Sequence, residues 1–238
     1  MERSIFISSK NRDAGVSENY KVNFYPVFNL DENYRWMMAL TKLSMTYSWY
    51  NVSASNNNNT LKYSKDSGSS WTTVTFPDGI YSYRDLQTYL NDDKIKFVLL
   101  YTRHKLMIEL ESGYQLDLRD GEFSNLLGFE KKLLTSTSIG TLTPNITNSI
   151  DNIHICVNKI RGFNPVDSRL VDSLFSFSTG NLRRGLNFEK EPIHPSFVPV
   201  KDLYFDSLMV HVRDDQGNLI DLNNIDWSMT IVLKPWEY

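Results

Sequence analysis

The sequence predicts an all-β fold, a β-sandwich that carries one small inserted α/β unit. Segments that alternate apolar and polar residues recur at irregular spacing, and eight or more of them have the length of a strand. Aromatic residues make up 13% of the 238 residues, a composition that favours sheets and wide contact surfaces. No internal repeat interrupts this pattern, so a two-layered sandwich is the simplest arrangement of so many strands.

The expected strands are distributed over most of the chain. The first ten residues have a strand's length, and Tyr20, Val22 and Phe24 alternate in a second strand that Pro26 is expected to end. The longest signal covers residues 35–49, with period-two alternation in its second half. Further strands are expected at residues 62–64, 72–76, 150–157, 170–177 and 203–212, and from Trp227 onward.

Residues 71–129 carry their own folding signals, and we place an inserted unit at residues 71–130. Ser82 and Asp85 have the spacing of a capping box at a helix start. Tyr81 and Leu86 stand where a hydrophobic staple is expected. A first helix should therefore begin after Ser82.

A second, short helix is expected at the end of the same unit. Asp120 is its predicted N-cap, and Gly128 is predicted to end it in the left-handed conformation. Between the helices, residues 97–101 and 106–110 alternate as a hairpin. The unit is thus a helix, a hairpin and a helix. It resembles no chemical site, which indicates an architectural role.

A proline-rich segment, residues 181–201, is predicted to form no regular element. Pro192, Pro195 and Pro199 lie within it, and each lacks the N–H that a strand or helix uses. We interpret the segment as a long ordered loop or as an arm that lies on a neighbouring subunit.

No catalytic or metal-binding signature is present in the sequence. His-Glu-x-x-His, Cys-x-x-Cys, Gly-x-Ser-x-Gly and phosphate-binding glycine loops are absent. The four histidines have no metal-pair spacing: His104, His154, His194 and His211. Since no ligand or nucleophile set emerges, we expect no enzyme, no cofactor, no metal and no catalytic residue.

Carboxylates and tryptophans leave two sugar-related alternatives to weigh. Glu109, Glu111 and Asp117 on the expected hairpin could pair for glycoside hydrolysis, but a solvated strand face explains their spacing. The five tryptophans could form sugar-stacking platforms, although most lie on alternating apolar faces typical of a core or subunit interface.

The remaining bulk features restrict the partners. A net charge of −3 does not favour nucleic acid or an anionic membrane, and no apolar run is long enough to span a bilayer. The single Cys156 excludes an intrachain disulfide and fits a reducing compartment. No targeting segment is visible, so the sequons at Asn51, Asn58 and Asn145 are expected to stay unmodified.

Several short stretches of the sequence form one pattern: residues 20–24, 34–40, 44–51, 76–83, 126–129 and 165–175. This pattern resembles the minor capsid (penton) protein of Polinton/Maverick elements and the related adintoviruses, and the resemblance spans roughly residues 20–233. It implies that residues 1–238 form a single jelly-roll domain, and the folding signals within residues 71–130 then predict that this unit is inserted between two of its strands. It supplies no catalytic residues.

The resemblance also implies an assembly. Homopentamers would close the five-fold vertices of an icosahedral capsid whose faces are built by a separate double-jelly-roll major capsid protein. The protein would belong to the virion, after folding in the host cytoplasm and assembly there or in the nucleus. A host receptor or another vertex protein is a further expected partner. The alternative from another class is a lectin-like or receptor-binding β-sandwich, which could be monomeric.

Overall fold

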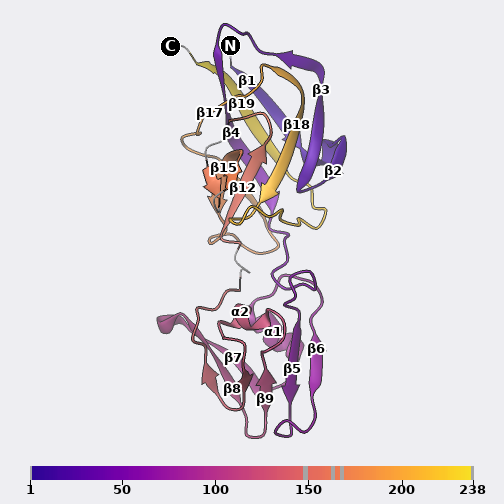
Figure 1. Ribbon diagram of the computed structural model, residues 1–238, viewed down its shortest axis with the longest axis vertical. Coiled ribbons are helices and arrows are strands. Elements are labelled where there is room, and N and C mark those ends of the chain that lie inside the picture. Colours follow the sequence, from indigo (N-terminus) through magenta and orange to yellow (C-terminus); the bar gives the residue numbers. More distant parts are fainter. Residues whose placement is uncertain (1, 147–149, 162–163, 167–168, 237–238) are drawn as a thin grey trace. The chain divides into compact units, whose positions relative to one another are not determined.

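The computed structural model describes residues 2–146, 150–161, 164–166 and 169–236, with only the backbone between 164 and 171. The chain divides into two compact units (Figure 1). Unit 1 combines Met1–Trp49 with Ile150–Tyr238, and unit 2 is Tyr50–Ser149. Because unit 2 lies between two halves of unit 1 in sequence, the chain leaves unit 1 once and returns to it once.

Unit 1 consists of two antiparallel sheets. The first, called the β1 sheet, has the order β1 (Arg3–Ser8), β19 (Ser228–Trp236), β4 (Arg35–Thr46) and β16 (Asn187–Lys190), with β17 (Val198–Pro199) also paired to β4. The second, called the β3 sheet, has the order β15 (Ser173–Ser178), β12 (Asn152–Val157), β18 (Tyr204–Arg213), β3 (Asn19–Asn29) and β2 (Ala14–Val16). The short elements η1 (Ser9–Asn11), β13 (Asn164–Val166) and β14 (Arg169–Val171) complete the unit.

The strand order is that of a jelly roll. Among the described residues, the eight principal strands in chain order are β1, β3, β4, β12, β15, the β16–β17 pair, β18 and β19. Numbered one to eight, they alternate between the sheets as 1-8-3-6 and 5-4-7-2. Two sheets linked in this way form the double Greek key of a jelly-roll sandwich, so the predicted all-β sandwich is confirmed.

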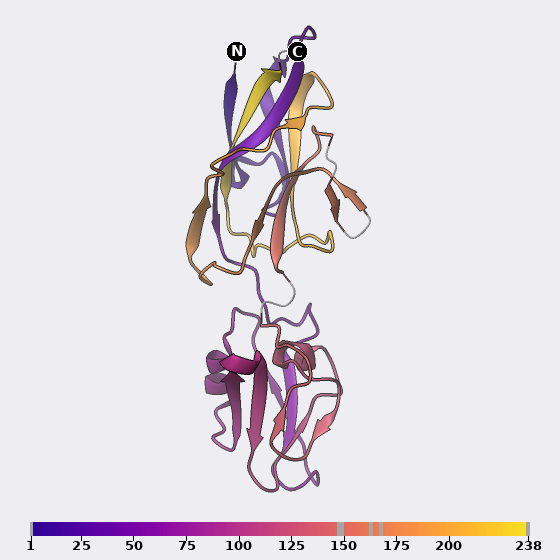
Figure 2. The same ribbon diagram turned by 90° about the vertical axis from the view of Figure 1, so that its left-hand side faces the viewer.

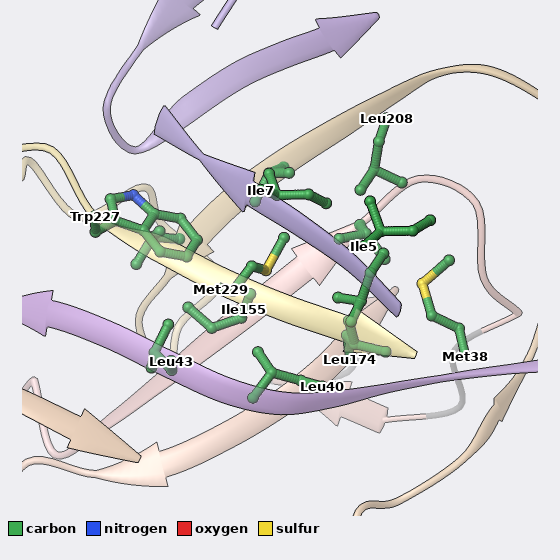
Figure 3. Close-up of a cluster of buried hydrophobic side chains, with 14 of the residues drawn as sticks. Ile5, Ile7, Met38, Leu40, Leu43, Ile155, Leu174, Leu208, Trp227 and Met229 are labelled. Atoms are coloured by element: carbon green, nitrogen blue, oxygen red, sulfur yellow. The ribbon is translucent and has the colours of Figure 1, made fainter. Parts of the chain in front are cut away.

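The core of unit 1 lies between the two sheets. Figure 3 shows Ile5 and Ile7 of β1 with Met229 of β19, opposite Ile155 of β12 and Leu208 of β18. All five side chains are at most 7% exposed. The alternation read from the sequence therefore has a direct cause, because inward-facing positions of both sheets meet in one apolar layer.

Pro26 does not end its strand, contrary to the sequence prediction. β3 continues to Asn29 and pairs with β18 on both sides of the proline. The register shifts between Phe205 and Ser207, so the strand is irregular opposite this point. A proline is tolerated at a bulge because the ladder there does not need its missing N–H.

The proline-rich segment is also more regular than predicted. β16 pairs with residues 43–46 of β4, and β17 pairs with Met37 and Met38. Together they form the interrupted edge strand of the β1 sheet. Prolines are acceptable in an edge strand, where one side of the backbone has no partner. The interpretation of residues 181–201 as an irregular loop or an arm on a neighbour is therefore wrong for these strands.

Unit 2 holds two small sheets and two helices around its own core. One sheet has the order β10 (Leu133–Leu134), β9 (Gln115–Asp117), β5 (Thr60–Ser64) and β6 (Thr72–Thr75). The other has the order β11 (Ser138–Ile139), β8 (Lys105–Leu110) and β7 (Ile95–Leu100), with the turn η2 (Tyr101–Arg103) at the hairpin tip. The helices are α1 (Tyr83–Leu90) and α2 (Phe123–Leu127).

The helix ends follow local sequence signals in three of four cases. Ser82 caps α1 in a reciprocal capping box with Asp85, and Gly128 ends α2 at φ +73°. Asn91 ends α1 in the left-handed conformation. The predicted N-cap Asp120 is wrong: Glu122 occupies that position without a side-chain hydrogen bond, and Asp120 pairs with Lys62 at 2.7 Å.

Unit 2 is wider than the 71–130 range expected from the sequence. β5 lies before that range but pairs with both β6 and β9, so it belongs to the same compact unit. The buried Asn51 fastens the two ends of the unit, since its side-chain N–H groups donate to Tyr81 O (2.7 Å) and Ile146 O (2.6 Å). Sequence periodicity cannot show such long-range pairings.

Candidate assembly surfaces

The four histidines lie in four different settings. His104 is exposed at the β7–β8 tip and His194 is exposed in the loop before β17. His154 and His211 lie on neighbouring strands of the β3 sheet. Among the described residues, His, Cys, Asp and Glu side chains nowhere gather in a group of three that could hold a metal ion.

His154 joins a serine and a carboxylate in a row that the sequence did not predict. Its Nδ1 lies 2.7 Å from Ser176 Oγ, and its Nε2 lies 3.5 Å from Asp215 Oδ1. The Asp215 carboxylate is also held by the backbone N–H of Asn152 at 2.8 Å. The pairing fixes the imidazole against the sheet. The distance from His154 Nε2 to Asp215 Oδ1 is longer than that of a good hydrogen bond. The geometry therefore supports a structural role for His154, which links β12 to β15 and to the turn after β18.

Cys156 behaves as a structural residue. It is 2% exposed and lies opposite His211 of β18. Burial raises the pKa of its thiol to about 12. A thiol held in its protonated form is a poor nucleophile, so its burial and pKa indicate a structural residue.

The carboxylates considered for glycoside chemistry have other partners. Asp117 accepts from the Arg119 guanidinium at 2.7 Å, which lowers the pKa of that carboxyl. Glu111 pairs with Lys94. Glu109 lies opposite Lys96 in the β7–β8 ladder. The three carboxylates do not share one hairpin, contrary to the expectation: Glu109 and Glu111 lie at the solvated β7–β8 hairpin, whereas Asp117 lies in β9 of the other small sheet with its side chain only 10% exposed.

The tryptophans divide into core and surface residues. Trp36, Trp49 and Trp227 are at most 5% exposed, whereas Trp71 is 40% and Trp236 is 51% exposed. Core packing therefore accounts for three of the five, as the alternation predicted.

Two flanks of the sandwich offer surfaces for side-by-side contact. The β1 flank consists of β1, η1 and β2, and it carries Phe6 (66% exposed) and Val16 (44% exposed). Within the described part of the chain, β1 pairs with β19 on one side only, so its other edge is unpaired. The β16 flank consists of β15 and β16, with Leu186 (52% exposed) just before β16. Exposed apolar residues and an open strand edge are typical of surfaces that associate.

Two asparagine sequons are inaccessible in the fold. Asn51 is 0% and Asn58 is 1% exposed. The side-chain amide of Asn58 donates to Asn51 O at 2.9 Å and its oxygen accepts from Ser53 N at 2.9 Å. Neither amide can carry a glycan without disrupting unit 2.

The sequence pattern did not predict one polar cluster, which lies at the start of β1. Arg3 occupies a core-facing position at the start of β1, ahead of the buried Ile5 and Ile7, and lines a pocket with Tyr34 and Asp31. A charged residue in register with two apolar ones is the signal that could have indicated it.

Neither helix among the described residues is long and apolar enough to cross a bilayer.

The likeness of this chain to known proteins lies in its structure. No family model and no curated protein matches the sequence. Among solved structures, the crystal structure of the selenomethionine-labelled penton protein of mavirus aligns with a TM-score of 0.54 at 10% identity, over 99% of this chain and 100% of that chain. At this identity the alignment establishes architecture, and the chain therefore has the jelly-roll fold of a viral penton protein.

Proposed function

We propose that this protein is a penton, the minor capsid protein that forms homopentamers at the five-fold vertices of an icosahedral capsid. The observation that carries the proposal is the end-to-end structural alignment with the mavirus penton protein, which includes unit 2 as well as the sandwich. The sequence phrases that resemble the Polinton/Maverick and adintovirus pentons support it independently. Its role is structural and its location is the virion.

A five-membered ring needs two different surfaces on each subunit. In such a heterologous contact, one flank of each copy binds the opposite flank of the next. The β1 flank and the β16 flank are the pair we assign, because Phe6 and Val16 are exposed on the first and Leu186 is exposed beside the second. A specific contact of this kind buries about 1,200–2,000 Å² in total. The ring would bind a double-jelly-roll major capsid protein around its rim.

The decisive experiment is the oligomeric state of the purified full chain. Native mass spectrometry and negative-stain imaging at about 10–50 μM should show five copies, since an interface of standard size commonly gives micromolar or tighter binding. Co-expression with the major capsid protein from the same genome tests whether the ring forms only on the capsid. A chain that stays monomeric in both settings contradicts the proposal and favours the lectin-like or receptor-binding alternative.

A further inference from the structure

A pocket of about 400 Å³ opens at the end of unit 1 where β1 begins and β19 ends. Figure 1 shows β1 and β19 side by side in the sandwich, with this pocket where β1 starts and β19 ends. Its volume lies within the range of small-molecule sites. It is lined by strand residues and by the connection between β3 and β4, chiefly Arg3, Asn29, Asp31, Tyr34, Trp36 and Pro235.

Arg3 points into this pocket because of strand register. It lies directly opposite Leu233, which is 0% exposed, and directly opposed residues of antiparallel strands share a face. The next core-facing residues of β1 are the buried Ile5 and Ile7. Among the described residues Arg3 forms no ion pair. Its guanidinium is therefore a cation at the mouth of an apolar core without a fixed counter-ion.

The opposite wall is held rigidly by a turn. Asp31 Oδ1 accepts from Asn33 N (3.0 Å) and Asn33 Nδ2 (2.8 Å), and Asp31 O accepts from Trp36 Nε1 (3.0 Å). These bonds fix the orientation of the Asp31 carboxylate and leave Oδ2 without a partner among the described residues. One fixed acceptor suits a hydroxyl donor on a ligand.

An aromatic ring completes the pocket. Tyr34 is 42% exposed, whereas the neighbouring Trp36 is only 5% exposed and forms part of the pocket wall. The π face of an exposed tyrosine attracts the weakly positive C–H groups on the apolar face of a sugar ring. Asn29 adds an amide that can both donate and accept.

We propose that this pocket binds a carboxylate-bearing sugar. Arg3 pairs with the sugar carboxylate, since a guanidinium matches that group with two parallel hydrogen bonds. Asn29 and Asp31 bind ring hydroxyls, and Tyr34 lies against the ring. On a protein at a capsid vertex, such a site would contact acidic glycans of a host surface. The binding itself does not depend on whether the chain forms pentamers.

The test uses the full chain and four small probes. N-acetylneuraminic acid and glucuronic acid carry both a ring and a carboxylate, glucose lacks the carboxylate, and glutamate lacks the ring. At about 10–20 mM, where millimolar binders are well populated, both acidic sugars should shift the NMR signal of the Trp36 indole N–H. The indole signal of Trp71, which lies in unit 2, should stay unchanged.

Matched variants separate this pocket from surface binding. Arg3→Ala and Tyr34→Ala should each weaken binding of the acidic sugars at least tenfold. The controls Arg103→Ala and Tyr101→Ala remove the same residue types from the exposed η2 turn and should leave binding unchanged. A thermal melt identifies any variant that fails to fold, and Arg3→Lys then provides a milder replacement that also removes the bidentate fork.

Three outcomes would overturn the proposal. The first is that neither acidic sugar shifts the Trp36 signal at these concentrations. The second is that folded Arg3 and Tyr34 variants retain the affinity of the parent. The third is that glutamate binds as tightly as the acidic sugars, which would assign the pocket to simple carboxylates or peptide ends. All three can be read in a monomer or a pentamer, so they are independent of the assembly test.

Discussion

Phe177 of β15 and Phe188 of β16 pack ring against ring, with centroids 5.6 Å apart and ring planes inclined by 56°. β15 is an edge strand of the β3 sheet and β16 is an edge strand of the β1 sheet. The contact therefore joins the two layers along one flank. Lys190 covers it from outside, with Nζ 5.9 Å from the centroid of Phe177.

Phe188→Ala should destabilise the sandwich by about 2 kcal/mol. A fully buried phenylalanine contributes roughly 3–5 kcal/mol, and Phe188 is only half-buried. Urea unfolding measures the difference. Leu186→Ala, which truncates an exposed side chain two residues away, is the control and should change stability by less than about 0.5 kcal/mol. Equal effects would mean that the ring contact does not hold the flank together.

Gly128→Ala should destabilise unit 2 by about 2 kcal/mol or more. At φ +73° an added Cβ is strained, and it would also lie 2.6 Å from Pro144 N and 2.8 Å from Leu142 O. Gly217→Ala is a matched control, because Gly217 has φ +81° with nothing within 4 Å of the added carbon. The control measures the backbone strain alone. If both variants lose the same stability, the close approach at Gly128 has no cost.

Unit 2, expressed as residues 50–149, should fold by itself. It has its own core, in which Phe76 and Phe123 stack with centroids 5.3 Å apart, and Asn51 fastens its ends. We expect a cooperative melt and dispersed NMR signals. Asn51→Ala in the same fragment should lower its stability, because the carbonyls of Tyr81 and Ile146 lose a buried donor. A fragment without cooperative unfolding would show that unit 2 depends on the sandwich.

Phe6→Glu should abolish pentamers and leave the subunit folded. Phe6 lies on the outer face of β1 opposite Thr230 and is 66% exposed, so a charge there removes little packing within the subunit. In the proposed ring the same charge would be buried against the next copy without a partner. Native mass spectrometry should give monomers, with a melting temperature close to that of the parent. Tyr101→Glu, a charge on the exposed η2 turn, should remain pentameric.

Stability should fall with pH below about 6.5, in part through His211. Burial and then the nearby Arg213 lower the pKa of this imidazole, so the folded protein binds its proton less readily than the unfolded chain. The contribution of His211 is therefore complete above the ordinary histidine pKa of about 6.5 and is lost as the pH falls toward the folded value. His211→Gln should flatten the dependence between about pH 5 and 7 in urea titrations. His194→Gln, which replaces an imidazole in the exposed loop before β17, is the matched control.

Helix caps and helix ends could be predicted from the sequence because the residues that form them are close together in the chain. Ser82 and Asp85 bond to each other's backbone N–H groups, and Gly128 is needed where φ is positive. The inward alternation of β4 and β19 was readable for the same reason, since each strand has one face in the core. Asp120 failed as an N-cap because Gly121 directly after it has φ +67°, a left-handed backbone, so the helix begins only after Glu122.

Structural features that depend on contacts between residues far apart in the chain could not be predicted from the sequence. Pro199 lies in a strand only because β4 presents an edge to it, and Pro26 is tolerated only because β18 is irregular opposite it. The width of unit 2 depends on the pairing of β5 with β9, which no local window contains. The pocket arises in the same way, because Arg3 meets the Asp31 turn only after β1 pairs with β19 at the far end of the chain.

The Asn51 bond to Ile146 gives unit 2 a property that reaches beyond its own folding. Unit 2 is one continuous segment of the chain between β4 and β12 (Figure 2), and this bond joins residues near the two ends of that segment. Mutations between Asn51 and Ile146 alter no residue of a jelly-roll strand. Evolution can therefore enlarge, replace or diversify unit 2 while the jelly-roll scaffold keeps its sequence constraints, and an experimenter can graft a foreign domain at the same two junctions.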